Sequence, residues 1–499
     1  MLRGEEFDWV IVGAGSTGGV AAARATENPR VRVLLLEAGA DYPRAIPSDL
    51  ASGGRNSVLR HDWGFGHVPT TGQRVPFVFP RGRVVGGSSS VNTCIALRGR
   101  PYDYDEWNSP DWTWEKCLPA FKRLETDLDF PESEWHGKRG PIRIRRHPRS
   151  EQVEWQAAFL DSCKLQGIPD CPDHNDPRAA GAGPHAMNKV GGERQSVLRC
   201  YLTSEVRRRE NLRIEPNVHV RRVIFEGTKA TGLEIERDGL VETLHCNRIM
   251  LSAGAINTPG VMLRSGVGPR ERVEKIGVTL VRDLPSVGAR LLDHHGAAIF
   301  FVPSLGVVDL DDPLIQTLYR YTSEGSPYPN DMQIQAGSLL PFPWITIPIV
   351  SLMAVVGKPV GCGEIHWDSA DPHARPRILS HVLERDDDRA RAIAALRRAY
   401  EIAQSEPMRS IARMVWPRHK TLFSDRMNEA IRSACDSGYH PCGTVPMHDA
   451  VDSRGRVRGT ANLYVADASI MPTIPSANTN LTCIMMGERF GEWMSRGEL

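Results

Sequence analysis

Three glycines near the amino terminus have the spacing of a dinucleotide-binding loop. Gly13, Gly15 and Gly18 form GxGxxG directly after the β-branched run from Asp8 to Val12. In such a loop the first glycine allows a tight turn, the second lets a pyrophosphate approach the backbone, and the third lets the next helix pack closely on the strand. Glu37 follows Gly18 by nineteen residues. A carboxylate there can accept hydrogen bonds from both hydroxyls of an adenosine ribose, which favours NAD or FAD over NADP.

The segments around these residues predict a strand, a turn, a helix and a second strand. Asp8 to Val12 and Val31 to Leu36 are short apolar runs suited to buried strands, and an Ala-rich segment up to about Thr26 separates them. A helix that begins at the loop offers free N–H groups and its positive dipole end to phosphates. The glycine spacing alone is a weak signal, because many such turns bind nothing. Strand, helix, second strand and acid together indicate a dinucleotide site in an α/β domain.

Composition limits the classes of partner. A chain of 499 residues is long enough for two or three domains. The net charge of +1 gives no electrostatic case for binding nucleic acid or an anionic membrane. The ten cysteines form no CxxC pair and no Cys/His cluster at zinc spacing, so we expect no metal site and reduced thiols. The amino terminus lacks the apolar core of a secretory signal, and we therefore expect a cytoplasmic protein.

One long segment requires a test for membrane insertion. Residues 332–357 carry no charged side chain, but Pro341, Pro343 and Pro348 would repeatedly break a spanning helix. We predict buried strand and loop, and no membrane span. The same segment could line an apolar substrate pocket.

Two segments after the second predicted strand are rich in glycine. Residues 61–78 have little regular period and predict an irregular segment, either over a ligand or at the surface. Residues 82–92, GRVVGGSSSVN, predict a compact turn. Its N–H and hydroxyl groups could meet phosphate or ring heteroatoms, and a flexible glycine-serine loop is the alternative.

Two long motifs carry a resemblance to a known family. GRVVGGSSSVNTCIALRGRPYDYDEW, from Gly82, resembles the first signature of the glucose-methanol-choline (GMC) family of FAD-dependent oxidoreductases. AGAINTPGVMLRSGVG, Ala253 to Gly268, resembles the second signature. The likeness extends over nearly the whole chain through LLLEAG, HGKRGPIRI and GGERQSVLRCYL.

The expected architecture is α/β, and α+β overall. It combines a Rossmann-like FAD-binding domain, residues 1–295 with 435–499, and a sheet-based substrate domain, residues 296–434. Parts of 100–190 could cover the active site. Within the FAD domain, Asn211 to Asp238 predicts a hairpin or meander and Arg248 to Ala253 a buried strand. In the substrate domain we predict strands at Ile299–Val302, Met332–Gln335 and Ile345–Val356 and a helix at Asp386–Gln404.

The carboxy-terminal part of the chain holds the candidate catalytic residues. Considered alone, His440 in a Pro/Gly turn is most simply solvated or structurally bonded, and Asn478 in SANTN is a turn or N-cap residue. The resemblance implies another role, because a His-Asn or His-His pair faces the flavin ring in that family. Alcohol oxidation needs a group that removes the hydroxyl proton and a hydride acceptor. His440 would accept the proton, Asn478 would hold the oxygen, and flavin N5 would accept the hydride.

The resemblance also implies a set of cofactor-binding residues, drawn from the glycine loop, both signatures, the adenine-binding strand and the carboxy-terminal segment. They are Gly13, Gly15, Ser16, Thr17, Gly18, Glu37, Ala38, Val85, Gly87, Ser88, Asn92, Thr93, Cys94, Ile95, Val220, Ala253, Tyr439, Asp467, Ala468 and Thr479. For Asp467, capping of the next turn is an equal alternative for the side chain.

The sequence departs from the family pattern at two places. Val91 stands where some members tether FAD to a histidine, and valine has no nucleophilic atom, so we expect non-covalent FAD. The pattern proline, x, serine, arginine, glycine is PVGCG at Pro359–Gly363 and lacks the arginine.

We therefore expect FAD-dependent oxidation of a small or aromatic primary alcohol, with oxygen or another electron acceptor. Choline is disfavoured, because residues 300–345 offer no obvious matching acid and no aromatic cage is evident. A hydroxynitrile lyase with non-redox FAD, an NAD-dependent dehydrogenase and a nucleotide-binding module without catalysis are the alternatives. The sequence leaves both oxidase and dehydrogenase open.

Overall fold

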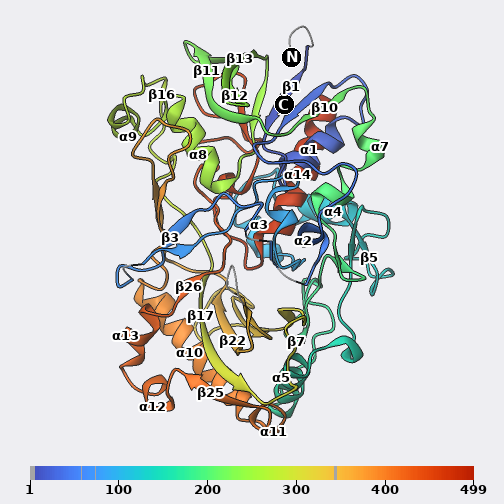
Figure 1. The fold of residues 1–499 in the computed structure, drawn as a ribbon, viewed down its shortest axis with the longest axis vertical. Coiled ribbons are helices and arrows are strands. Elements are labelled where there is room, and N and C mark those ends of the chain that lie inside the picture. The colour runs from blue at the N-terminus through green and yellow to red at the C-terminus, as the bar shows by residue number, and fades with distance from the viewer. Residues whose placement is uncertain (1–5, 55, 58, 74, 342–345) are drawn as a thin grey trace.

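Two large sheets organise the chain, one in each half of the molecule (Figure 1). The computed structural model describes residues 6–54, 56–57, 59–73, 75–341 and 346–499. The upper half in Figure 1 holds both ends of the chain, and the lower half is formed mainly by the middle of the chain.

A five-stranded parallel sheet forms the centre of the upper half. Its order is β10 (Leu212–Glu215), β2 (Val33–Leu36), β1 (Trp9–Val12), β14 (Ile249–Leu251) and β27 (Leu463–Val465). Helices α1 (Gly18–Ala25) and α8 (Gly254–Arg264) follow β1 and β14. The predicted strand, turn, helix and strand around the glycine loop are confirmed, as is the predicted strand between residues 248 and 253.

The last helix of the chain, α14 (Thr479–Arg496), packs tightly against α1. A Cβ on Gly487 would lie 2.7 Å from the carbonyl oxygen of Thr17, and one on Gly491 would lie 2.5 Å from Cβ of Arg24. Only glycine allows this approach, because no larger side chain fits between the helices. The packing brings the start of α14 to the glycine loop, where Ser16 Oγ donates a hydrogen bond to Asn480 Oδ1 at 2.8 Å.

The predicted meander is confirmed in β11 (His219–Glu226), β12 (Lys229–Arg237) and β13 (Leu240–His245), with a turn at residues 227–228. Its first segment, β10, instead joins the parallel sheet. We predicted that residues 61–78 would be irregular, and this is only partly correct. They contain β3 (Gly66–Val68) and β4 (Phe77–Val78), which pair with each other and with β24 (Arg377–Leu379), itself paired with β23 (Glu364–His366). Strands of two or three residues are too short to show a period in sequence.

The second sheet dominates the lower half and is antiparallel. Its order is β25 (Ala412–Trp416), β17 (His295–Pro303), β22 (Val350–Val356), β19 (Met332–Gly337), β18 (Ile315–Tyr321) and β7 (Gly181–Pro184), and β26 (Asp436–Ser437) also pairs with β17. One face packs on α5 (Glu154–Leu165) and α10 (Asp386–Ala403) in a common apolar core. The strands predicted at 299–302 and 332–335 and the helix predicted at 386–404 are confirmed. The strand predicted at 345–356 is interrupted, because only Val350–Val356 form β22, Thr346–Ile347 form β21 in a separate two-stranded sheet, and Ile345 lies outside the described residues.

The uncharged segment 332–357 contributes β19 and β22 to this sheet. Along β19, Met332, Ile334 and Ala336 point into the core under the helices, and the residues between them line a cavity on the other face. One face of these strands therefore packs in the core and the other lines the cavity, which accounts for the apolar character of the segment. Among the described residues, no helix combines the length and apolarity needed to cross a membrane.

The structure places α5 and β7, from the region before residue 190, with the second sheet. The domain limits proposed above remain a prediction. Shorter elements complete the described fold: α2 (Ser48–Ala51), η1 (Gly87–Ser90), α3 (Pro101–Asp105), α4 (Trp114–Leu124), β5 (Glu125–Asp127), β6 (Ile142–Ile144), η2 (Arg149–Glu151), β8 (Lys189–Val190), β9 (Glu193–Arg194), α6 (Val197–Cys200), α7 (Ser204–Arg207), β15 (Val267–Gly268), α9 (Arg270–Lys275), β16 (Arg282–Asp283), β20 (Leu340–Pro341), β21 (Thr346–Ile347), α11 (Glu406–Arg409), α12 (His419–Leu422), α13 (Met427–Arg432) and η3 (Ala468–Ile470).

Candidate active site

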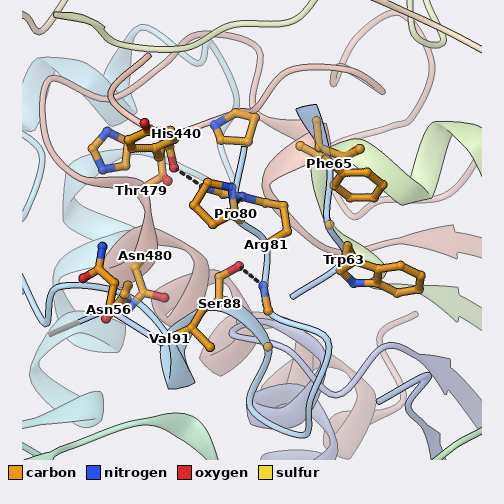
Figure 2. Close-up of a pocket in the computed structure, with 18 of the residues that line it drawn as sticks. Asn56, Trp63, Phe65, Pro80, Arg81, Ser88, Val91, His440, Thr479 and Asn480 are labelled. Atoms are coloured by element: carbon orange, nitrogen blue, oxygen red, sulfur yellow. Dashed lines mark hydrogen bonds between the residues drawn. The ribbon is translucent and has the colours of Figure 1, made fainter. Parts of the chain in front are cut away.

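A cavity of about 1140 Å³ is lined by residues of both halves, from the glycine loop after β1 to the inner face of the second sheet. It brings together most of the residues predicted from sequence, although they are spread over the whole chain. These are Gly13, Gly15, Ser16, Thr17, Glu37, Ala38, Gly87, Ser88, Asn92, Thr93, Ile95, Val220, Ala253, Tyr439, His440, Asp467, Ala468, Asn478 and Thr479. Gly18, Val85 and Cys94 do not line it. Figure 2 shows His440 and Thr479 near Pro80 and Arg81 of the segment before the first signature.

The glycine loop fits the diphosphate of a dinucleotide. Gly13 has φ +104°, and a Cβ there would lie 2.3 Å from the carbonyl oxygen of Ser252. Gly18 lies behind the loop, where a Cβ would meet the carbonyl oxygen of Gly13 at 2.1 Å. The backbone N–H groups of Gly15, Ser16 and Thr17 have no acceptor within the described part of the chain. Unpaired donors at the start of α1 are suited to phosphate oxygens.

The first-signature loop lies directly against this glycine loop. A Cβ on Gly87, which has φ +53°, would lie 2.7 Å from Cα of Gly15. The Gly82 N–H donates to Ser88 Oγ at 3.2 Å, which makes the turn compact (Figure 2). A group bound by residues 13–18 would therefore also contact residues 87–88.

Arg194 holds this loop in place, and sequence reasoning did not single it out. Its guanidinium donates to the carbonyl oxygens of Leu50 at 3.1 Å and Ser52 at 2.9 Å, and to Asn92 Oδ1 at 3.1 Å. The same Asn92 oxygen accepts from the N–H of Cys94 at 3.0 Å, where φ is +61°. Buried Cys94 thus supports the loop from behind. The only sequence signal for Arg194 was its place in GGERQSVLRCYL.

Glu37 follows β2 directly and lines the cavity beside the glycine loop. Its carboxylate accepts from the N–H groups of Ala14 at 3.0 Å and Gly39 at 2.8 Å, and burial raises the pKa of Glu37 to about 7. Its backbone carbonyl accepts from the N–H of Val218, two residues before Val220 on the same segment. The acid and the segment carrying Val220 are therefore fixed to each other on one side of the cavity.

The Asp467 side chain is occupied by capping. Its carboxylate accepts from the Gly254 N–H at 2.9 Å, Thr258 Oγ1 at 2.6 Å and the Ser469 N–H at 2.8 Å. It thereby caps α8 and η3, in agreement with the capping alternative. Burial raises the pKa of Asp467. Asp467 and Ala468 nevertheless line the cavity.

His440 and Asn478 are in direct contact and belong to a longer hydrogen-bonded chain. Asn478 Nδ2 lies 2.9 Å from His440 Nε2, and His440 Nδ1 lies 2.9 Å from His294 Nδ1. His294 Nε2 lies 2.9 Å from the carbonyl oxygen of Pro475. His294, just before β17 in an adjacent pair of histidines, was missed in the sequence.

The carbonyl group of Pro475, at the end of this series of hydrogen bonds, determines which ring nitrogen of each histidine carries the proton. A carbonyl oxygen only accepts, so His294 Nε2 must carry a proton, and neutral His294 then has a lone pair on Nδ1. His440 therefore donates from Nδ1 and keeps a lone pair on Nε2, toward which the Asn478 amide donates. Burial, followed by the neighbouring His294, holds the pKa of His440 well below its usual range. Burial also lowers the pKa of His294 to about 4.

A buried carboxylate fixes the backbone under both rings. Asp293 Oδ1 accepts from the N–H of His440 at 2.8 Å and from the N–H of His294 at 2.8 Å, and Ser437 Oγ donates to its other oxygen. Burial raises the pKa of Asp293 to about 6. Gly438 lies against the same rings, since a Cβ there would be 2.9 Å from Cβ of His294 and 3.1 Å from His440 Nδ1. A neutral imidazole whose Nε2 lone pair accepts only a weak amide hydrogen bond, from Asn478, is suited to accept a hydroxyl proton once a substrate takes the place of that bond.

Family models match most of the chain. The amino-terminal GMC oxidoreductase model matches residues 7–296 and the carboxy-terminal one matches residues 359–487. The chain belongs to the GMC oxidoreductase family. Its curated relatives include oxygen-dependent choline dehydrogenase 1 of Chromohalobacter salexigens, 32% identical over 99% of this chain and 95% of the relative. Another is 5-(hydroxymethyl)furfural oxidase of Methylovorus sp., 30% identical over 97% of this chain and 98% of the relative.

Solved structures agree with this assignment. Pyridoxine 4-oxidase from Mesorbium loti superimposes with a TM-score of 0.90 at 26% identity, over 98% of this chain and 99% of that one. The recognised family, the Rossmann-type fold and the assignment as an oxidoreductase of CH–OH donors are thereby confirmed. GMC oxidoreductases are FAD-dependent, and the donor-rich glycine loops of this chain fit the diphosphate of FAD.

Two features of this GMC oxidoreductase bear on the substrate end of the cavity. Val91 lines the cavity and presents an apolar side chain. Asp436 of β26 also lines it, and sequence reasoning did not consider this acid. Its carboxylate accepts from Tyr439 Oη at 2.8 Å and lies 3.0 Å from His67 Nε2, so protein donors already contact it.

A second cluster of ionisable groups lies outside the cavity. Glu125, Asp127 and His136 are the one group of potential metal ligands found among the described residues. His136 contacts Glu125 Oε1 at 2.7 Å and Asp173 Oδ2 at 2.9 Å, and Arg146 bonds Asp127 and Asp173. Protein cations thus neutralise these acids, and the cluster has a structural explanation.

Proposed function

We propose that this GMC oxidoreductase oxidises a small or aromatic primary alcohol to its carbonyl compound, using FAD held without a covalent bond. The observation that carries the proposal is the series of hydrogen bonds that runs from Asn478 through His440 and His294 to the carbonyl oxygen of Pro475. It provides a neutral base and an amide donor at one point of the cavity that the glycine loops also line.

The two side chains divide the work on the hydroxyl group. The substrate oxygen would insert between the two side chains, so that its O–H donates to His440 Nε2 and the Asn478 amide exchanges its bond to His440 for one to the substrate oxygen. As His440 takes the proton, the oxygen becomes more negative and the Asn478 hydrogen bond strengthens. FAD bound in the cavity would supply the acceptor for the hydride that leaves the carbon. His294 keeps Nε2 of His440 free of a proton before the reaction.

Several observations support the finer points. Relatives are named for oxidation of choline and of 5-(hydroxymethyl)furfural, both with a primary alcohol group, and oxygen or another acceptor would reoxidise the enzyme. The apolar side chain of Val91 favours dissociable FAD. All ten cysteines are free of disulfides, which supports a cytoplasmic location.

The test is an anaerobic screen. Purified holoenzyme is mixed with primary alcohols, and the yellow absorbance of oxidised flavin is followed before and after oxygen is admitted. We expect at least one alcohol to bleach the flavin, and oxygen or an added dye to restore the colour. Flavin that stays oxidised with every alcohol, while a cyanohydrin is cleaved, would establish a lyase and contradict the proposal. Protein precipitated by acid should release its FAD into the supernatant.

A further inference from the structure

The inner face of the second sheet is an uncharged wall of the cavity. Alternate residues of β17, β22 and β19 line it, and paired positions across the strands form rows. One row is Ala298, Met353 and Gln335; the next is Gly296, Val355 and Gln333. Leu318 of β18 stands opposite Gln335 on the other side, so apolar side chains flank this amide.

The orientation of both amides in this wall is determined by a backbone carbonyl. Gln333 Nε2 donates to the carbonyl oxygen of Ser476 at 2.9 Å, two residues before Asn478. Gln333 Oε1 must then face Gln335, and Gln335 Nε2 donates to it at 2.9 Å. This leaves Gln335 Oε1 without a donor among the described residues, although the side chain is only 6% exposed.

Gln335 Oε1 faces the cavity and pairs with no donor of the described residues, so it is available to an O–H or N–H group of a ligand. We propose that Gln335 Oε1 recognises a hydrogen-bond donor on the substrate, away from the carbon that is oxidised. The substrate class is then a neutral primary alcohol that carries a second O–H or N–H group, such as a hydroxyl on an aromatic ring. This inference rests on the proposed function and specifies its substrate.

The wall explains why a neutral donor is preferred over a charged group. The members of both rows that line the cavity are uncharged. Arg320 of β18 completes the second row opposite Gln333, but it donates to Ser476 and does not line the cavity. A cationic substrate group placed there would lose its hydration without gaining a carboxylate from these rows. A neutral O–H loses less hydration and gains the Gln335 acceptor, so the wall selects by hydrogen bonding.

The experiment compares ligands that differ in one donor. Binding of 4-methylphenol and 4-methylanisole to the oxidised holoenzyme is measured by calorimetry, because neither carries an alcohol that could be oxidised. We expect the parent enzyme to bind the phenol roughly tenfold more tightly or better. Gln335→Met should bring the ratio of the two dissociation constants to about one. Gln335→Asn keeps an amide oxygen but on a side chain shorter by one methylene, so it should reduce the preference for the phenol only in part.

Met353→Leu is the matched control, since it changes the neighbouring position of the same row without touching the amides. It should shift both dissociation constants by a similar factor. A parent enzyme without preference for the phenol, or a Gln335→Met enzyme that keeps it, would overturn the inference.

The same variants tested with 4-hydroxybenzyl and 4-methoxybenzyl alcohol separate the two proposals. If neither alcohol bleaches the flavin but Gln335 controls phenol binding, the proposed reaction fails and the acceptor role stands. If both alcohols bleach the flavin equally well in parent and Gln335→Met enzymes, the reaction stands and the acceptor role fails.

Discussion

Replacing His294 tests whether the orientation of the catalytic histidine depends on its neighbour. In His294→Leu, Nδ1–H of His440 loses its acceptor at 2.9 Å, at a position where His294 is only 1% exposed. Leaving a buried donor unpaired costs about 1 to 3 kcal/mol. His440 can avoid this cost by moving its proton to Nε2, but a protonated Nε2 faces the Asn478 amide and cannot accept the substrate proton.

The form with a lone pair on Nε2 then becomes the less populated tautomer by the cost of the unpaired donor. At 1.36 kcal/mol per factor of ten, the cost corresponds to a decrease of roughly 5- to 150-fold in the rate constant of flavin reduction. The assay is anaerobic stopped-flow bleaching of the flavin at saturating alcohol, so that weaker binding does not enter. His294→Asn retains an oxygen near the Nδ1 position and should recover part of the rate.

The matched control for this variant is His295→Gln. His295 directly follows His294, but its Nδ1 accepts from the Leu383 N–H at 3.3 Å and does not contact His440. This variant should reduce its flavin at nearly the parent rate. A His294→Leu enzyme with unchanged folding and FAD content that reacts as fast as the parent would refute the assignment of the proton positions.

Three further predictions concern pH, cofactor binding and stability. Because the pKa of His440 is held well below 6.5 and only its neutral form accepts a proton, the rate of flavin reduction should stay flat as pH falls from 8 to 6.5, and a decline centred near 6.5 or above would contradict this. Gly87→Ala places a Cβ 2.7 Å from Cα of Gly15, so the purified protein should contain much less FAD by absorbance, and a variant with the parent FAD content would contradict this. Burial alone would lower the pKa of His136, but its hydrogen bonds to Asp127, Asp173 and Glu125 raise it to about 10. Protonated His136 therefore stabilises the fold fully below the unfolded-state pKa of about 6.5, and this contribution is lost as the pH rises through the folded-state pKa of about 10. The loss of unfolding free energy in His136→Gln, measured by urea unfolding, should accordingly become smaller between pH 7 and 10.

The parts of the fold that could be predicted are those encoded by local patterns. The strand, glycine loop and helix at residues 8–26 follow from adjacent residues, and α10 follows from the helical spacing of its apolar side chains. The pairing of β7 with β18 joins residues more than a hundred positions apart and leaves no local pattern.

The same distinction applies to the site. His440 and Asn478 could be named because they fall in motifs, and the structure places them 2.9 Å apart. His294 and Gln335 could not, because their roles depend on contacts that only the folded sheet creates. A histidine next to another histidine and a glutamine in an apolar strand carry no sequence signal for the proton positions or the acceptor described above. Arg194, which holds the first-signature loop, was hidden for the same reason.

The central claim is that His440 removes the substrate proton as the alcohol reduces the flavin. The most direct test is the rate at which one primary alcohol bleaches the flavin without oxygen in the parent, His440→Ala and Asn478→Ala enzymes, each with full FAD content. Loss of the base should slow the bleaching by about 10² to 10⁴ and loss of the amide donor by about 10² to 10³. A His440→Ala enzyme that bleaches its flavin at the parent rate would contradict the account.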